Sequence, residues 1–124
     1  MAISISPAEW QIMEILWKEP RTLMELVRTL TESEGWAKST VTTLVRRLEQ
    51  KKVIGYEAQG RTKTFYPLVS RDEVVAQQSE SLLKRAYHGS LGLFVSSMVQ
   101  RNNLSREDID ELYRILHKAE EDLK

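Results

Sequence analysis

The sequence contains no cysteine among its 124 residues. This absence excludes disulfide bonds, zinc sites built from thiolates and catalysis by a cysteine nucleophile. Histidine is scarce too, since only His88 and His117 occur, and two histidines are too few for a histidine metal cluster without carboxylates or a second subunit. We therefore expect no metal site and no cofactor.

Long apolar runs are also missing. No stretch approaches the roughly 18 consecutive apolar residues of a transmembrane helix, and the opening MAISISPAEW lacks the basic start of a secretion signal. We therefore expect a cytoplasmic protein without membrane insertion. A Gly-rich phosphate loop, an HExxH motif and a nucleophile elbow are absent, and acidic pairs such as Glu107-Asp108 suit a helix start, so we expect no enzyme.

The chain as a whole has no excess of either charge, because 18 basic residues balance 18 acidic ones. The distribution along the chain is uneven. Residues 38–63 hold seven Lys or Arg against two Glu, a net charge of +5, whereas residues 70–124 hold eight basic and ten acidic residues, a net charge of −2. An anionic partner is therefore expected to bind the segment 38–63.

What the sequence does contain is a globular composition, 41% hydrophobic and 29% charged, with strong helix-start signals. Ser6-Pro7-Ala8-Glu9 and Thr22-Leu23-Met24-Glu25 are capping boxes, so helices are expected to begin after Ser6 and after Thr22. The first helix should end near Lys18, ahead of Pro20. A gap of about eight residues, 31–38, is expected before the next helix.

A third helix is expected over residues 38–52. Its apolar residues fall at positions 41, 44, 45 and 48, the spacing of one buried helix face. The opposite face carries hydroxyl and guanidinium groups, which bind phosphates and base edges in nucleic acids, although a solvated helix that happens to be basic is the plain alternative. The candidate DNA-binding residues on this helix are Lys38, Ser39, Thr40, Thr42, Thr43, Arg46 and Arg47.

After Lys52 the pattern changes from helix to strand. Residues 53–58 and 64–69 are rich in β-branched and aromatic residues around a glycine-containing turn, which predicts a hairpin. Three helices followed by a two-stranded hairpin describe a winged helix, in which the third helix enters a major groove and the hairpin tip lies over phosphates. Arg61 and Lys63 at the tip are therefore candidate DNA contacts, unless they merely solvate an exposed turn.

The second half is expected to be helical throughout, so that a winged-helix domain of residues 1–70 precedes a helical dimerisation domain of residues 71–124. Helix starts at Ser70, Ser90 and Ser105 predict three amphipathic helices. Because short helices are marginal alone, these must either fold back on the winged helix or pair with a second copy, and we favour a homodimer. The candidate interface residues are Leu91, Phe94, Val95, Met98, Ile109, Leu112, Tyr113 and Leu116.

Five segments of the chain resemble the BlaI/MecI family of penicillinase repressors and occur in the same order as in that family. They are ISPAEWQIMEILW, GWAKSTVTTLVRRLEQKKVI, TKTFYPLVS, LLKRAYHGSLGLFVSSMV and LSREDIDELYRIL. The resemblance covers nearly the whole chain. It implies a mainly α fold with a small β-hairpin wing, and a homodimeric repressor that binds a palindromic operator in double-stranded DNA. It also implies that a membrane sensor protease of BlaR/MecR type is a partner.

The sequence departs from that family at two places. Family members often begin the third helix with Ser-Pro, whereas this chain has Ala37-Lys38, so the N-cap is either missing or shifted to Ser39. At the family's Asn-Phe cleavage bond the aligned residues are Ser97-Met98, so cleavage there is not expected. The Cys-x-Cys motifs of copper-responsive relatives are absent. A different class of function, a winged helix that binds an acidic protein through the same basic helix, remains open.

Overall fold

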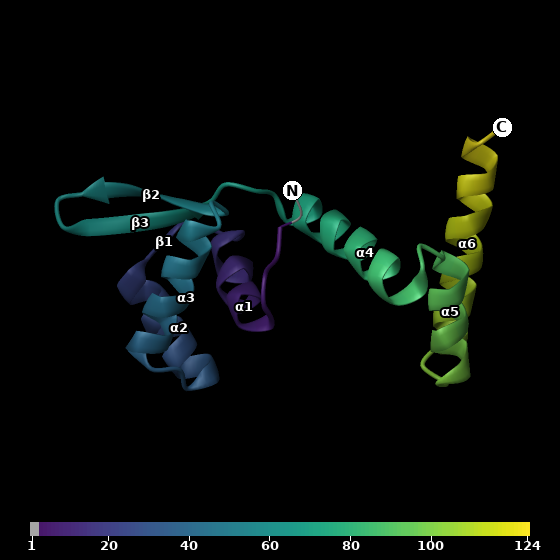
Figure 1. The fold of residues 1–124 in the computed structure, drawn as a ribbon, viewed down its shortest axis with the longest axis horizontal. Helices are drawn as coiled ribbons and strands as arrows, with labels where there is room; N and C mark the ends of the chain where they lie inside the picture. The colour runs from purple at the N-terminus through teal and green to yellow at the C-terminus, as the bar shows by residue number, and fades with distance from the viewer. Residues whose placement is uncertain (1–2) are drawn as a thin grey trace. The chain divides into compact units, whose positions relative to one another are not determined.

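The computed structural model describes residues 3–124, which form two compact units that divide after Ser79 (Figure 1). The first unit contains the helices α1 (Pro7–Leu16), α2 (Leu23–Glu34) and α3 (Lys38–Gln50) and a small antiparallel sheet. It also includes the first turns of α4 (Arg71–Tyr87), since Val74 is fully buried in its core. The first unit thus extends into the helix where we expected the second domain to begin.

Local hydrogen bonds explain where α1 and α2 begin. The hydroxyls of Ser6 and Thr22 accept from the backbone N–H of Glu9 and Glu25, and each glutamate accepts in return from the N–H of its capping residue. Both predicted capping boxes are confirmed. Helix α1 ends at Leu16, two residues before the expected end.

Helix α2 is longer than the sequence pattern indicated. It continues to Glu34, so only residues 35–37 separate it from α3, and the expected gap of about eight residues was wrong. The polar residues 32–34 stay helical with their side chains exposed, and the helix stops at Gly35, whose φ of 72° lies in the left-handed region. The turn of the helix-turn-helix is therefore tight.

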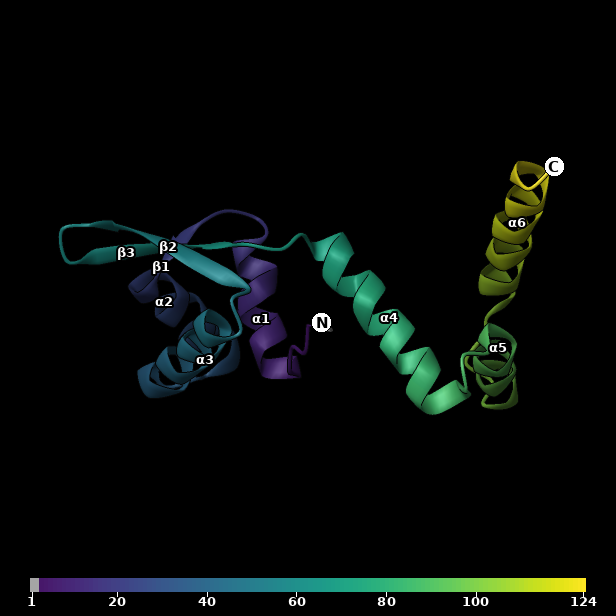
Figure 2. The same ribbon diagram turned by 45° about the horizontal axis from the view of Figure 1, so that its top comes forward.

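The sheet has three strands, although the sequence pattern predicted two. Strands β2 (Ile54–Gln59) and β3 (Thr62–Pro67) form the predicted hairpin, and β1 (Arg21–Thr22) pairs with the other edge of β3, giving the order β1-β3-β2. β1 has only two residues, which is too short for a periodic signal. The wing, which we define as β2, β3 and their turn, projects beyond the helices in both ribbon views (Figures 1 and 2).

The core of the first unit lies between the three helices and the base of the wing. Ile12 and Met13 from α1, Leu26 from α2 and Val41 from α3 are completely buried, and Phe65 from β3 joins them. Trp36, which follows α2, is partly buried and packs against this cluster under the turn. The wing and α3 are therefore fixed to one shared core.

The second unit has a different character. Helices α5 (Leu91–Gln100) and α6 (Arg106–Asp122) begin at the predicted caps Ser90 and Ser105. Ahead of these caps the chain leaves the helical conformation at His88 and at Asn102, which adopt positive φ. No residue of either helix is buried. In the described part of the chain, none of the helices has the length and hydropathy that crossing a bilayer demands.

Candidate nucleic-acid interface

Helix α3 has the two faces that its sequence predicts. The four apolar residues Val41, Leu44, Val45 and Leu48 are all buried, with at most 5% of any side chain exposed. The opposite face is open to solvent. Lys38, Ser39, Thr40, Thr43, Arg46 and Arg47 are exposed there.

The N-terminus of α3 has no side-chain cap. Ala37 occupies the cap position in an extended conformation, with φ −72° and ψ 157°, and its methyl group cannot accept a hydrogen bond. Ser39 lies inside the helix, so of the two possibilities left open by the sequence, the cap is missing. The free N–H groups of this first turn lie beside Lys38 and Ser39, where a phosphate oxygen could accept from them.

Thr42 differs from the other candidate residues. It is half-buried, and its hydroxyl donates to the carbonyl oxygen of Lys38 at 2.8 Å. This back-bond uses the hydroxyl proton and leaves the oxygen as an acceptor.

The wing places its two basic residues beside α3. Arg61 and Lys63 are both exposed, and the ammonium group of Lys63 lies 4.3 Å from the centroid of the Tyr56 ring. Tyr56 in turn contacts Phe65 edge to face, with ring centroids 6.0 Å apart. This stack connects Lys63 to the buried core, so its position is restrained more than that of a lysine on a free turn.

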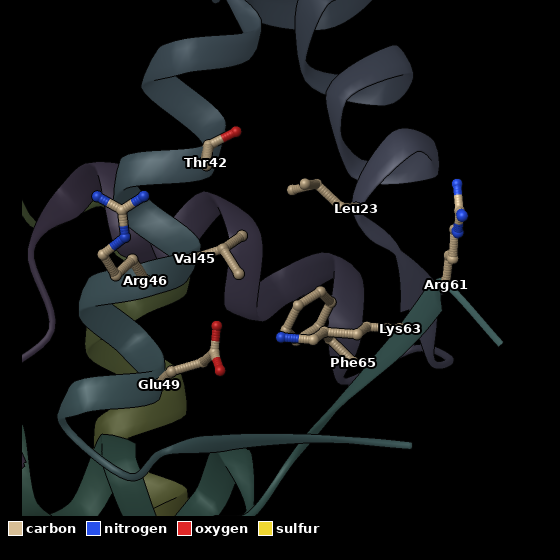
Figure 3. A pocket seen from close by; sticks show the side chains of 8 residues that line it. All are labelled: Leu23, Thr42, Val45, Arg46, Glu49, Arg61, Lys63 and Phe65. Atoms are coloured by element: carbon tan, nitrogen blue, oxygen red, sulfur yellow. The ribbon is translucent and has the colours of Figure 1, made fainter. Parts of the chain in front are cut away.

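A depression of about 300 Å³ lies between α3 and the wing (Figure 3). Arg46 and Thr42 come from α3, and Lys63 and Arg61 come from the wing. Its apolar part is formed by Val45 and Phe65, each 3% exposed, and by Leu23 at the start of α2. The structure thus brings Thr42 and Arg46 of the helix together with the two basic residues of the wing, as the sequence could not show, while the other five helix candidates lie outside the depression.

Not every basic residue counted in segment 38–63 contributes free positive charge to this surface. Arg46, Arg47, Arg61 and Lys63 take part in none of the ion pairs formed among residues 3–124. Lys51, which the sequence count included, is paired with Glu9 at 2.6 Å. The free positive charge is therefore concentrated on the exposed face of α3 and on the wing, where a polyanion would meet it.

Two contributors to this surface are not among the candidate binding residues. Glu49 is half-buried and lines the depression with Arg46 and Lys63, so a carboxylate stands among the basic groups. Leu23 lines it from α2. The helical spacing placed Glu49 near the edge of the buried face, but only the packing of the wing against α3 shows what it faces.

The candidate interface residues of the second unit form an uncovered apolar surface. Leu91 is 58% exposed, Tyr113 is 71% exposed and Leu116 is 58% exposed. The other candidates are half-buried within their own unit, where Phe94 contacts Tyr87 edge to face at 5.3 Å. These half-buried candidates are Phe94, Val95, Met98, Ile109 and Leu112.

Three helices, a β wing and a free basic face on the third helix define a DNA-binding protein of the winged helix-turn-helix class. Comparison with known proteins defines it further. The family model described as penicillinase repressor matches residues 5–118, and the chain belongs to this family. It is a DNA-binding transcriptional repressor, so the open alternative of a protein-binding winged helix is not favoured.

Two relatives illustrate the likeness. The chain is 30% identical to the penicillinase repressor of Bacillus licheniformis over 115 residues, which cover 92% of this chain and 90% of the relative. It is 29% identical to the methicillin resistance regulatory protein MecI of Staphylococcus aureus, over 92% of this chain and 94% of the relative.

Solved structures show the same fold. The DNA-binding domain of the repressor BlaI matches 59% of this chain and 90% of its own, with a TM-score of 0.55 and 24% identity. The protein in the hsRosR-S4 complex matches 98% of this chain and 94% of its own, with a TM-score of 0.56 and 14% identity.

Proposed function

We propose that the protein represses transcription as a homodimer that binds a palindromic operator in double-stranded DNA. One observation carries the proposal: Arg46 of α3 and Arg61 and Lys63 of the wing, none of them in an ion pair among residues 3–124, line one depression beside the exposed face of α3. We assign base-edge readout to Ser39, Thr40, Thr42 and Thr43, shared base and phosphate contact to Arg46 and Arg47, and phosphate contact to Lys38, Arg61 and Lys63.

The exposed apolar residues of α5 and α6 support pairing of two copies. In a monomer Leu91, Tyr113 and Leu116 would remain more than half exposed to water. A C2 dimer would cover them and would present two copies of α3 to half-sites separated by about 34–36 Å, one turn of DNA. The binding free energies of the phosphate contacts of both copies would then add. The dissociation constant would reach about 10⁻⁸–10⁻¹¹ M, the range of specific DNA sites.

A membrane sensor protease of BlaR/MecR type is a proposed partner, but proteolysis at the family's bond is not part of the proposal. Ser97 and Met98 lie inside α5, and both are half-buried. A protease would have to unfold that helix to reach the bond between them. We therefore propose that a sensor of this type, if it acts on the chain, acts at another bond or without cleavage.

Selection of bound duplexes from a random pool tests the proposed function. We expect enrichment of two inverted half-sites whose centres are about 10 base pairs apart, bound by one dimer. A variant with Arg46→Ala and Arg47→Ala serves as the control and should retain little of the enriched pool. Enrichment of single asymmetric sites, or of no sequence at all, would overturn the proposal.

A further inference from the structure

The N-terminal segment Ile3–Ser6 lies between two helices that are far apart in the sequence. The backbone N–H of Ile3 donates to the side-chain oxygen of Gln77 at 2.9 Å, and the side-chain amide of Gln78 donates to the carbonyl oxygen of Ile5 at 3.4 Å. Both glutamines belong to the first turns of α4. On this side the segment is therefore attached to α4.

On its other side the same segment is attached to the end of α3. Lys51 is the C-cap of α3, and its ammonium group donates to the carbonyl oxygen of Ser4 at 2.7 Å and to the carboxylate of Glu9 at 2.6 Å. The same carboxylate oxygen accepts from the backbone N–H of Ser6 at 2.9 Å. One lysine thus joins α3, the N-terminal segment and α1.

The burial of Glu9 shows that its role exceeds capping. Glu25 performs the same capping role in α2 with 42% of its side chain exposed, whereas the side chain of Glu9 is only 2% exposed. A buried carboxylate is costly unless it is paired, and Lys51 supplies the pairing. Capping alone would leave the carboxylate in water, as it does at Glu25.

We propose that Lys51 is a positioning residue that holds the C-terminal end of α3 at a fixed place against the first turns of α4. We call this set of contacts the clasp. It consists of Ile3–Ser6, Glu9, Lys51, Gln77 and Gln78. Helix α4 continues from the first unit into the second, so the clasp joins the DNA-reading helix to the helix that leads toward the proposed dimer interface.

The consequence for DNA binding rests on the proposed function. Binding of the second half-site is intramolecular, and its strength depends on how narrowly the position of the second α3 is defined. Loosening the clasp should therefore weaken binding to a complete palindrome by more than the square of the factor by which it weakens binding to one half-site. Loss of a phosphate contact would instead weaken each bound half-site by the same factor.

The first test does not involve DNA. Because the chain has no cysteine, Gln50→Cys and Ser79→Cys, both at exposed positions within the first unit, provide a single pair of spin labels. We expect Lys51→Met to broaden the distance distribution between the labels, and Lys51→Arg to restore it. Lys52→Met is the matched control, because it removes the same charge at the next residue, which forms no ion pair among residues 3–124. An unchanged distribution in Lys51→Met would overturn the proposal whatever the protein binds.

Should Lys51→Met fail to fold, the double variant Gln77→Ala, Gln78→Ala loosens the clasp at its partly exposed end and should broaden the same distribution. The second test compares full and half operators taken from the duplex selection. We expect the loss of affinity that the clasp variants show on the full operator to exceed the square of their loss on the half-site by about tenfold. A loss on the full operator that does not exceed this square would overturn the coupling, whereas failure of the unmodified protein to bind any duplex would contradict the proposed function and leave the spin-label result standing.

Discussion

At the scale of single residues, our proposal divides the side chains between α3 and the wing into groups that read bases and groups that bind phosphates. A guanidinium group can donate two parallel hydrogen bonds to guanine. An ammonium group on a hairpin instead attracts the phosphates of the DNA backbone as a point charge. Arg46 projects from the exposed face of α3, and Lys63 stands over Tyr56 on the wing. Truncation of Arg46 and truncation of Lys63 should therefore change DNA binding in different ways.

We predict that Arg46→Ala costs about 1–3 kcal/mol of binding free energy and relaxes the preference at one operator position. Lys63→Ala should weaken binding to all sequences evenly and reduce the dependence of log K on log salt by about one. Titrations of both variants on the operator and on single-base variants of it, at several salt concentrations, measure this. If the two variants gave the same pattern, the division between reading and phosphate binding would be wrong.

Because of the buried residue Glu9, the stability of the fold should depend on pH in the acidic range. Burial by itself would raise the pKa of the Glu9 carboxyl, but hydrogen bonds from Lys51 and from Ser6 outweigh it and hold the pKa below its ordinary value of 4.5. A lowered pKa means that the ionised group stabilises the folded state above the unfolded pKa. This contribution is lost as the pH falls through the lower, folded value.

We predict that Glu9→Gln lowers the free energy of unfolding by about 1–3 kcal/mol at neutral pH, because Lys51 loses its charged partner. The difference between the variant and the unmodified protein should shrink as the pH falls from 4.5 through the lower pKa of the folded state, since the carboxyl then loses its charge as well. Urea unfolding of both proteins across this range measures the difference. A difference that stays constant with pH would show that the charge of Glu9 does not stabilise the fold.

At the scale of elements, α3 is unusual among the helices of the first unit because its N-terminus is uncapped. The cap positions of α1 and α2 carry Ser6 and Thr22, whereas that of α3 carries Ala37. An uncapped helix start leaves N–H groups without protein partners, and at this surface phosphate oxygens could serve them. The missing cap is therefore consistent with a site that binds an anion.

We predict that Ala37→Ser raises the free energy of unfolding by about 1 kcal/mol, because the extended backbone of Ala37 already has cap geometry. Chemical unfolding measures the change. Ala76→Ser, at an exposed position inside α4, is the matched control and should stabilise nothing, since serine is a poorer helix former than alanine. Equal effects at the two positions would rule out capping as the cause.

At the scale of the whole molecule, the exposed apolar surface of the second unit supports the proposed pairing of two copies. Leu116 is 58% exposed, and no residue of α5 or α6 is buried. A monomer would leave this surface in water, at a cost that grows with its apolar area. Pairing removes that cost and supplies the symmetry that a palindrome requires.

We predict that Leu116→Glu produces a monomer and weakens binding to the full operator by at least about a hundredfold, because the second set of phosphate contacts is lost. Sedimentation and DNA titration measure the two effects. Lys118→Glu introduces the same side chain on the other side of α6 and should remain a dimer. If Leu116→Glu stayed dimeric at micromolar concentration, the proposed interface would be wrong.

The sequence by itself determined the parts of this protein that depend on neighbouring residues. The capping boxes at Ser6, Thr22 and Ser105, the breaks at His88 and Asn102, and the buried and exposed faces of α3 all follow from hydrogen bonds and spacings within a few residues. The local sequence is sufficient to predict these features, because a helix turn brings together residues that are three or four positions apart.

Only the tertiary structure decided the contacts between distant segments. The pairing of β1 with β3, the depression between α3 and the wing, and the clasp could not be predicted from local patterns. Glu9 and Lys51 are 42 positions apart, and Ile3 and Gln77 are 74 apart. The spacing of such residues along the chain does not show that they meet, because the distance between them is set by how the whole core packs. For this reason the net charge counted along residues 38–63 includes Lys51, although its ammonium group is paired with Glu9.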